Sequence, residues 1–278
     1  MTPWLETCRL CVQDIESVLE RLPTRVEREP VLRLGVGGDD TTEIDQAAED
    51  VVVARLEALE EDFVLVSEEL GERTFGAGGS PRVVVDPIDG SVNAKRGIPF
   101  FSFSLAVADG PAMADVSFVY VYDFGTGEEW TAERGAGAFL NGVRIGALRP
   151  KDTIEILSFE GTTTPAIAEL IEDVVGLAGR VRVMGSLALS LCHLAAGRVD
   201  GVVCLKPARS VDVAAAQLLI RECGLAMELF EDPPLDAAPL DLGMRSRLAA
   251  AASPELVERL AAALQVRSPR SDRTATRS

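Results

Sequence analysis

Helical patterns begin this sequence, a run of strand-like segments follows, and strands alternate with helices in its second half. Residues 5–22 fit an amphipathic helix, and residues 44–60 repeat apolar side chains at helical spacing. Short apolar strands separated by glycines are expected between Phe63 and Ile145, with a glycine-rich loop from Gly71 to Gly79. From Ile154 to Gly224 we expect strands and helices in turn, as in α/β layers, with one of the helices over residues 165–178. The order predicts an α+β half followed by an α/β half.

The change of pattern divides the chain into two predicted domains. The chain has 278 residues, which is about two typical domain lengths. We expect an N-terminal α+β domain over residues 1–149 and a C-terminal α/β domain over residues 150–266. Residues 267–278 are polar and basic, so we expect them to form a disordered tail.

The composition is strongly acidic. Lys and Arg number 27 against 44 Asp and Glu, which gives a formal net charge of −17. A chain this acidic repels nucleic-acid phosphates, so DNA and RNA are not expected partners. No apolar run approaches the ~18–20 residues of a membrane span, and charges interrupt residues 1–22, so we expect neither a membrane segment nor an export signal. The same charge opposes the binding of small phosphate esters unless a cation is recruited.

Cysteine and histidine offer this chain little catalytic chemistry. The five cysteines are sparsely spaced and odd in number, which favours a reducing cytoplasm. Cys8 and Cys11 form a C-x-x-C without a second cysteine pair, so we favour packing over a metal or redox role. The single histidine, His193, lies in an apolar helical segment and fits a packed or half-exposed position. No G-x-S-x-G or P-loop sequence occurs, so carboxylates must carry any catalysis.

Acidic residues stand where predicted strands end and where a later helix begins. Glu68 and Asp86 each follow a short apolar strand, and Asp212 begins a helix. Pro87 keeps the backbone out of a helix, so Asp86 and Asp89 can face the same space. Clustered carboxylates repel one another unless a cation lies between them, and hard oxygen ligands suit Mg²⁺ or Mn²⁺.

Turns and helix caps are the alternative explanation for each of these acids. Asp-Pro and Asp-Gly pairs are common in turns, and Asp212 can cap a helix. Thr42 and Asp45 likewise have the spacing of a helix capping box. Turns and caps do not explain why all of these residues occur together.

The combined pattern resembles the inositol monophosphatase family of the lithium-sensitive, metal-dependent phosphatase superfamily. It rests on three segments, with Asp45 and Gly185-Ser186-Leu187 at matching places: Ser67-Glu68-Glu69, Asp86-Pro-Ile-Asp-Gly-Ser-Val-Asn93 and Val211-Asp-Val-Ala-Ala215. The run from Gly97 to Ala106 is most similar to the archaeal-type branch, whose members act as inositol monophosphatases and fructose-1,6-bisphosphatases. The resemblance implies an α-β-α-β-α five-layer sandwich of the sugar phosphatase type.

The resemblance also implies a site for two Mg²⁺ ions, for which Mn²⁺ can substitute. Glu68, Asp86 and the backbone carbonyl of Ile88 would hold one ion. Asp86, Asp89 and Asp212 would hold the second, and a third, weaker ion would share Glu68. Such ions neutralise the acids, lower the pKa of a bound water and align it for attack on phosphorus.

The remaining site residues are also implied by the resemblance. Asp45 and Ser91 would orient and deprotonate the attacking water, beside Glu68. The amides of Gly90 and Ser91 would receive the substrate phosphate. The sugar or polyol would contact Asp212 and the backbone of three consecutive residues, Gly185, Ser186 and Leu187.

The chain departs from the family pattern near its last acidic ligand. Leu205 stands where many inositol monophosphatases have a Glu that holds inositol hydroxyls, and Val211 replaces an aromatic residue. Lys206 and Arg209 lie between them. These two cations are either solvated loop charges or a clamp for a second phosphate or for sugar hydroxyls.

The sequence therefore predicts a Mg²⁺-dependent, cytoplasmic phosphatase of small sugar or polyol phosphomonoesters. Inositol-1-phosphate and fructose-1,6-bisphosphate are the first candidate substrates, and 3′-phosphoadenosine phosphate and histidinol phosphate are alternatives. A non-catalytic phosphate-binding regulator on the same scaffold is the alternative from another class. The resemblance also implies a homodimer.

Overall fold

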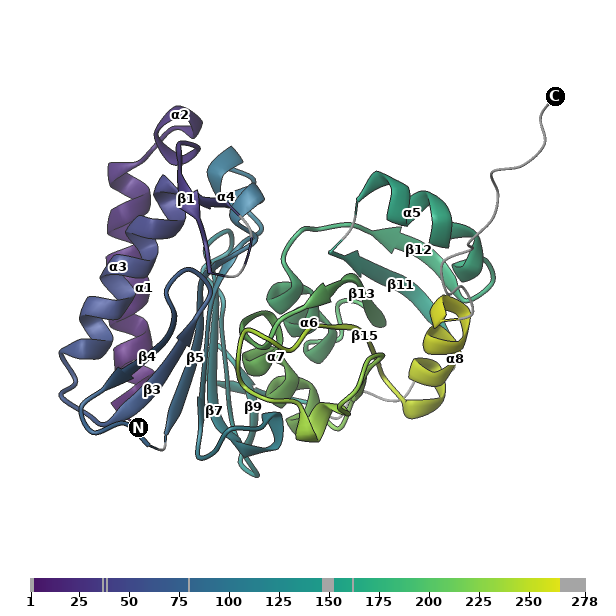
Figure 1. Ribbon diagram of the computed structural model, residues 1–278. Coiled ribbons are helices and arrows are strands. Elements are labelled where there is room, and N and C mark those ends of the chain that lie inside the picture. Colours follow the sequence, from purple (N-terminus) through teal and green to yellow (C-terminus); the bar gives the residue numbers. More distant parts are fainter. Residues whose placement is uncertain are drawn as a thin grey trace.

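The chain folds into five layers, in which two sheets alternate with three layers of helices (Figure 1). The computed structural model describes residues 3–265 except residues 37, 39, 80, 147–152 and 162. The layers confirm the expected α-β-α-β-α sandwich.

The first sheet contains eight strands in the order β10-β9-β8-β7-β6-β5-β3-β4. Their bounds are β3 Phe63–Ser67, β4 Gly71–Phe75, β5 Arg82–Asp89, β6 Ser102–Ala108, β7 Val116–Asp123, β8 Glu129–Glu133, β9 Gly137–Leu140 and β10 Val143–Ile145. Strands β3 and β5 run parallel, and β5 pairs antiparallel with β6. A separate hairpin of β1 (Val31–Leu34) and β2 (Asp40–Thr42) precedes this sheet.

Helices α1 (Pro3–Arg21) and α3 (Glu43–Glu57) cover the outer face of the first sheet (Figure 1). Both helices were predicted from their apolar periodicity. Their buried side chains, such as Ile15 and Ile44, pack with Phe63 of β3 in one apolar core. The short helix α2 (Arg25–Arg28) joins them to the hairpin, and α4 (Ser91–Arg96) follows β5.

The second sheet has five strands in the order β12-β11-β13-β15-β14. Their bounds are β11 Ile154–Glu160, β12 Ala178–Arg182, β13 Gly201–Ala208, β14 Ala226–Leu229 and β15 Ser246–Ala251. Helices α6 (Leu187–Ala195) and α7 (Ser210–Glu222) pack between the two sheets. Helices α5 (Thr164–Leu170) and α8 (Pro254–Gln265) and the 3-10 turn Ile171–Val174 lie on the outer face, and a further 3-10 turn spans each of Met113–Asp115 and Leu235–Ala237.

The structure corrects several local predictions. The segment from Gly71 was expected to be a loop, but Gly71–Phe75 forms edge strand β4, where the Phe75 ring stacks on Phe63 at 4.7 Å. The helix expected over 165–178 ends at Leu170, and the sequence analysis named no elements for β14, β15 and α8.

The first sheet ends at Ile145 and the second begins at Ile154. The predicted domain boundary after residue 149 and the predicted tail over 267–278 both lie outside the described residues. Within the described part of the chain, no helix combines the length and the apolar character that crossing a membrane requires.

Cysteine and histidine side chains lie in the apolar interior. Cys8 and Cys11 lie on the buried face of α1, and burial raises the pKa of both thiols. The His193 ring packs at 5.6 Å from the Phe100 ring and 6.0 Å from the Trp130 ring, as expected for a packed helix histidine.

Candidate active site

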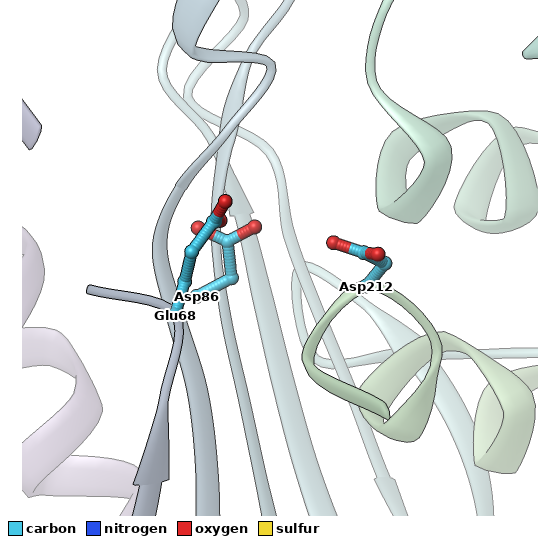
Figure 2. A group of neighbouring side chains, drawn as sticks. All are labelled: Glu68, Asp86 and Asp212. Atoms are coloured by element: carbon cyan, nitrogen blue, oxygen red, sulfur yellow. The ribbon is translucent and has the colours of Figure 1, made fainter. Parts of the chain in front are cut away.

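Three acidic side chains from separate elements meet where the first sheet faces helix α7. Because β3 and β5 are parallel neighbours, Glu68 and Asp86 lie at the same edge of the sheet. Asp212, in the first turn of α7, faces them from the middle layer (Figure 2). One carboxylate oxygen from each residue lies within 4.8 Å of those of the other two. The structure thus brings three of the four predicted carboxylate ligands into one cluster.

Asp89, the fourth predicted carboxylate, is bound to the opposite layer. It ends β5, whose register shifts between Asp86 and Asp89. Its Oδ2 accepts hydrogen bonds from the Ser186 hydroxyl and from the Ala188 amide, the latter at 2.8 Å. Asp89 therefore lines the same cleft as the cluster, while one of its oxygens connects the two layers.

Arg209 lies within the acidic cluster. Its guanidinium Nη2 is 2.6 Å from Glu68 Oε1 and 3.1 Å from Asp212 Oδ1. Its backbone amide also donates to Asp212 Oδ2 at 2.7 Å. The residue is only 7% exposed, so the alternative of a solvated loop charge is wrong for Arg209. The acids explain this position, because a cation between them relieves their repulsion.

Burial and mutual repulsion disfavour the charged form of the clustered carboxylates. Burial raises the pKa of Glu68, and the nearby Asp212 carboxylate adds to this while Arg209 opposes it. Burial, followed by repulsion from Glu68, also raises the pKa of Asp86. A divalent cation would reverse both effects, and all the available donors are carboxylate oxygens, which Mg²⁺ and Mn²⁺ prefer. The residues present therefore fit a hard divalent cation.

A cleft of about 630 Å³ opens beside the cluster. This volume suits a ligand of the size of a sugar phosphate. Predicted site residues along its wall are Glu68, Asp86, Ile88, Asp89, Gly90, Ser91, Gly185, Leu187, Lys206, Arg209 and Asp212. Lys206 is exposed there, whereas Arg209 is buried.

Asp45 and Ser91 line a smaller cavity together with Glu68, Asp86 and Ile88. Asp45 Oδ2 accepts from the Thr42 amide at 3.0 Å and from its hydroxyl at 2.5 Å. This is the capping box that the sequence predicts at the start of α3. Capping therefore uses one oxygen of Asp45 and leaves the side chain facing the cavity.

Glycines allow a close approach between the two layers beside the site. Gly90 begins α4 with a φ of +93°, and a Cβ there would lie 3.0 Å from the Gly185 carbonyl oxygen. The amide of Gly185 donates to Glu160 Oε2 at 2.8 Å, and the Ser186 hydroxyl donates to Asp89. These two donors are thus engaged within the protein, which limits the predicted contacts of the Gly185–Leu187 backbone with a sugar.

Three residues of the site were not predicted from the sequence: Glu160, Lys95 and Glu49. Glu160 and Lys95 line the cleft, and Glu49 accepts hydrogen bonds from the Ser67 hydroxyl and, at 3.3 Å, from the Glu69 amide. A sequence feature could have identified each of these residues. Glu160 follows an apolar strand as Glu68 does, Lys95 is one of three lysines, and Glu49 lies one helical turn after Asp45.

Comparisons with known proteins give matches along most of the chain. The family model described as "Inositol monophosphatase family" matches residues 10–268. A fructose-1,6-bisphosphatase/inositol-1-monophosphatase from Methanothermobacter thermautotrophicus is 30% identical over 273 residues, which cover 95% of this chain and 97% of the relative. A protein of the same name from Thermococcus kodakarensis is 40% identical over 190 residues, or 68% of this chain and 69% of the relative.

Solved structures show the same fold. An inositol monophosphatase-fructose 1,6-bisphosphatase aligns with a TM-score of 0.82 and 27% identity, over 95% of this chain and 100% of that protein. The alignment covers both sheets, since it includes nearly all of the described residues. The acidic cluster, the five layers and the match along almost the whole sequence lead to one conclusion: the chain belongs to the inositol monophosphatase family.

Proposed function

We propose that this chain is a Mg²⁺-dependent phosphatase that hydrolyses small sugar or polyol phosphomonoesters. The observation that carries the proposal is the meeting of Glu68, Asp86 and Asp212 beside a cleft of about 630 Å³. The names of the relatives support inositol-1-phosphate and fructose-1,6-bisphosphate as the first substrates to test. 3′-Phosphoadenosine phosphate and histidinol phosphate are the next compounds to test.

Five residues would hold the metal ions: Glu68, Asp86, Ile88 through its carbonyl, Asp89 and Asp212. When bound, two Mg²⁺ ions, or Mn²⁺ in their place, would lower the pKa of a water and neutralise charge on the phosphate. A third ion would share Glu68.

Asp45 is suited to accept a proton from the attacking water. The Thr42 amide donates to Asp45 Oδ2, which fixes the carboxylate. Asp45 and Ser91 line the same small cavity. Burial raises the pKa of Asp45 even though the Thr42 bonds oppose this, which makes the carboxylate a better proton acceptor. The water oxygen would bond to phosphorus as the ester P–O bond breaks, and the leaving oxygen would take a proton from solvent to become the alcohol. Asp45 would return its proton to solvent as the alcohol and inorganic phosphate leave.

Gly90 and Ser91 are the proposed phosphate-binding residues. Both residues line the cleft at the start of α4, where the first amides of a helix have no partner within the helix, so phosphate oxygens can approach these amides. Lys206, exposed on the cleft wall, is proposed to contact a second phosphate or sugar hydroxyls. Arg209 would contribute to that contact only after leaving Glu68 and Asp212. Contacts from Gly185, Ser186 and Leu187 would come from backbone groups not engaged within the protein.

Three further assignments remain proposals. We propose two domains, over residues 1–149 and 150–266, because each half builds its own sheet. We propose a homodimer, which the resemblance to the family implies. The buried, free cysteines support a cytoplasmic location.

The proposal is tested by phosphate release from the four candidate compounds, with Mg²⁺, with Mn²⁺ and with EDTA. Asp86→Asn should lower kcat/KM at least about a hundredfold, because it removes a ligand shared by both ions. Asp50→Asn, the same substitution at an exposed position of α3, is the matched control. Equal turnover in EDTA would contradict the proposal. A folded protein that binds metal but hydrolyses none of the compounds would favour the regulator.

A further inference from the structure

Glu160, the last residue of β11, is a buried carboxylate with four hydrogen-bond donors. It is 1% exposed. Its Oε1 accepts from the hydroxyls of Ser158 at 2.8 Å and Ser190 at 2.7 Å, and from the Met184 amide at 3.3 Å. Its Oε2 accepts from the Gly185 amide at 2.8 Å. Burying a carboxylate costs free energy unless such bonds offset the lost hydration. These bonds therefore strongly fix the backbone groups that donate to Glu160, the amides of Met184 and Gly185.

Glu160 holds the segment that joins β12 to α6. Asn93 holds the same segment from the first sheet's side, since its Nδ2 donates to the Met184 carbonyl at 2.8 Å. Gly185 has a φ of +96°, and a Cβ there would lie 2.8 Å from Asn93 Nδ2. The segment is thus fixed between a carboxylate on one side and an amide side chain on the other.

The segment leads directly to Asp89. Ser186 follows Gly185 and is the N-cap of α6, and its hydroxyl donates to Asp89 Oδ2. The Ala188 amide donates to the same oxygen at 2.8 Å. A contiguous chain of bonds therefore runs from Glu160 through Gly185 and Ser186 to Asp89, across the two layers.

We propose that Glu160 is a positioning residue for Asp89. By fixing Gly185 and Ser186, it sets the rotation of the Asp89 carboxylate, so that Oδ2 stays with α6 and the other oxygen is left to a metal ion. The inference rests on the proposed metal-dependent function. It predicts that Glu160 affects the ion held by Asp89 and leaves the ion held by Glu68 and Asp86 little changed.

The test is calorimetric titration of Mn²⁺ into the metal-free protein. Glu160→Gln keeps the shape of the side chain but places an NH₂ group among four donors. We expect one class of Mn²⁺ site to lose about 10–100-fold in affinity, the size typical of groups that orient a metal ligand, and the other class to change less than about threefold. Glu155→Gln, an exposed residue on the same strand, is the control and should bind Mn²⁺ as the wild type does.

Two further variants test the chain of bonds from Glu160 to Asp89. Ser186→Ala breaks the next link of the chain, so the double variant with Glu160→Gln should bind Mn²⁺ within about twofold of the weaker single variant. If the losses of Mn²⁺ affinity multiply in the double variant, the proposed chain of bonds from Glu160 to Asp89 is overturned. If Glu160→Gln does not fold, Ser190→Ala removes one donor to Glu160 and should cause a smaller loss in the same class of site.

The outcomes separate this inference from the proposed function. A folded Glu160→Gln protein with wild-type affinity in both classes would overturn the positioning role alone. A wild-type protein that binds no Mn²⁺ would overturn the proposed function and the inference together. In Mg²⁺, the variant should need more metal for half-maximal activity while the KM for the substrate changes little, a split that a general loss of stability does not produce.

Discussion

Replacing Arg209 by Met should destabilise the metal-free protein much more than the metal-loaded protein. The guanidinium is 7% exposed and pairs with Glu68 at 2.6 Å and with Asp212 at 3.1 Å. Met fills similar space without the charge, so the two carboxylates would face each other with no cation between them. Metal ions at the same carboxylates would replace the missing charge.

The expected size follows from the burial of the pair. Removing one partner of a buried ion pair costs about 3–5 kcal/mol. Glu68 can relieve part of this cost by taking up a proton, since burial raises its pKa, so the lower end of the range applies near neutral pH. A loss of about 3 kcal/mol lowers the melting temperature of a chain of this size by about 6–12 °C. Mg²⁺ at a hundred times its dissociation constant raises the free energy of unfolding by about 2.7 kcal/mol.

Thermal unfolding in EDTA and in saturating Mg²⁺ measures this difference. The wild type also gains from Mg²⁺, but it must first give up its Arg209 pairs, so the gap between the two proteins should shrink by at least half. Arg180→Met is the control, because Arg180 and Glu155 form an exposed pair whose loss should cost less than about 1 kcal/mol. A drop for Arg209→Met that is equal in EDTA and in Mg²⁺ would refute the reasoning.

Two further substitutions test the support of the site. Burial raises the pKa of Glu49 from 4.5 to about 7, so its contribution to the stability of the metal-free protein is present below pH 4.5 and is lost as the pH rises through 7, by up to about 3 kcal/mol. Urea unfolding at pH 5 and pH 8 should therefore show a flatter pH dependence for Glu49→Gln, and an unchanged slope would speak against this role. Gly185→Ala should cost about 1–3 kcal/mol of stability and lower Mn²⁺ affinity, because a Cβ at a φ of +96° meets Asn93. Gly142→Ala, at a φ of +74° in open space, should cost stability but not Mn²⁺ affinity, and equal metal binding by both variants would contradict the argument.

The acids at strand ends could be predicted from sequence because local pattern and sheet topology determine them. An apolar run that stops at Glu68 marks the end of β3, and one that stops at Asp86 marks the irregular last part of β5, which ends at Asp89. Parallel neighbours such as β3 and β5 bring these parts to one edge of the sheet. Asp212 is different, because it comes from another layer and no local pattern pairs it with the first sheet. Only the resemblance to a family connected it with Glu68 and Asp86.

The position of Arg209 could not be predicted from its neighbours in sequence. Its segment resembles a polar loop, and its burial arises from Glu68, which is far away in the chain. Edge strand β4 escaped prediction for a similar reason. Glu72, Arg73 and Thr74 are exposed, so the segment has a loop-like composition, and pairing with β3 makes it a strand. Glu160, in contrast, satisfies the same strand-end rule as Glu68 and could have been identified.

The charge of the cleft implies an order of binding. Among the residues that the structure describes, seven acidic ones line the cleft, against the cations Lys95, Lys206 and Arg209. Arg209 is already paired with Glu68 and Asp212, so it offers little attraction to an anion. A phosphate that entered before the metal would meet repulsion at short range, which is strong in a partly buried site. Calorimetry should therefore detect no binding of inorganic phosphate in EDTA and clear binding in Mg²⁺. Phosphate binding of equal affinity in both conditions would mean that the lysines, and not metal ions, attract the substrate.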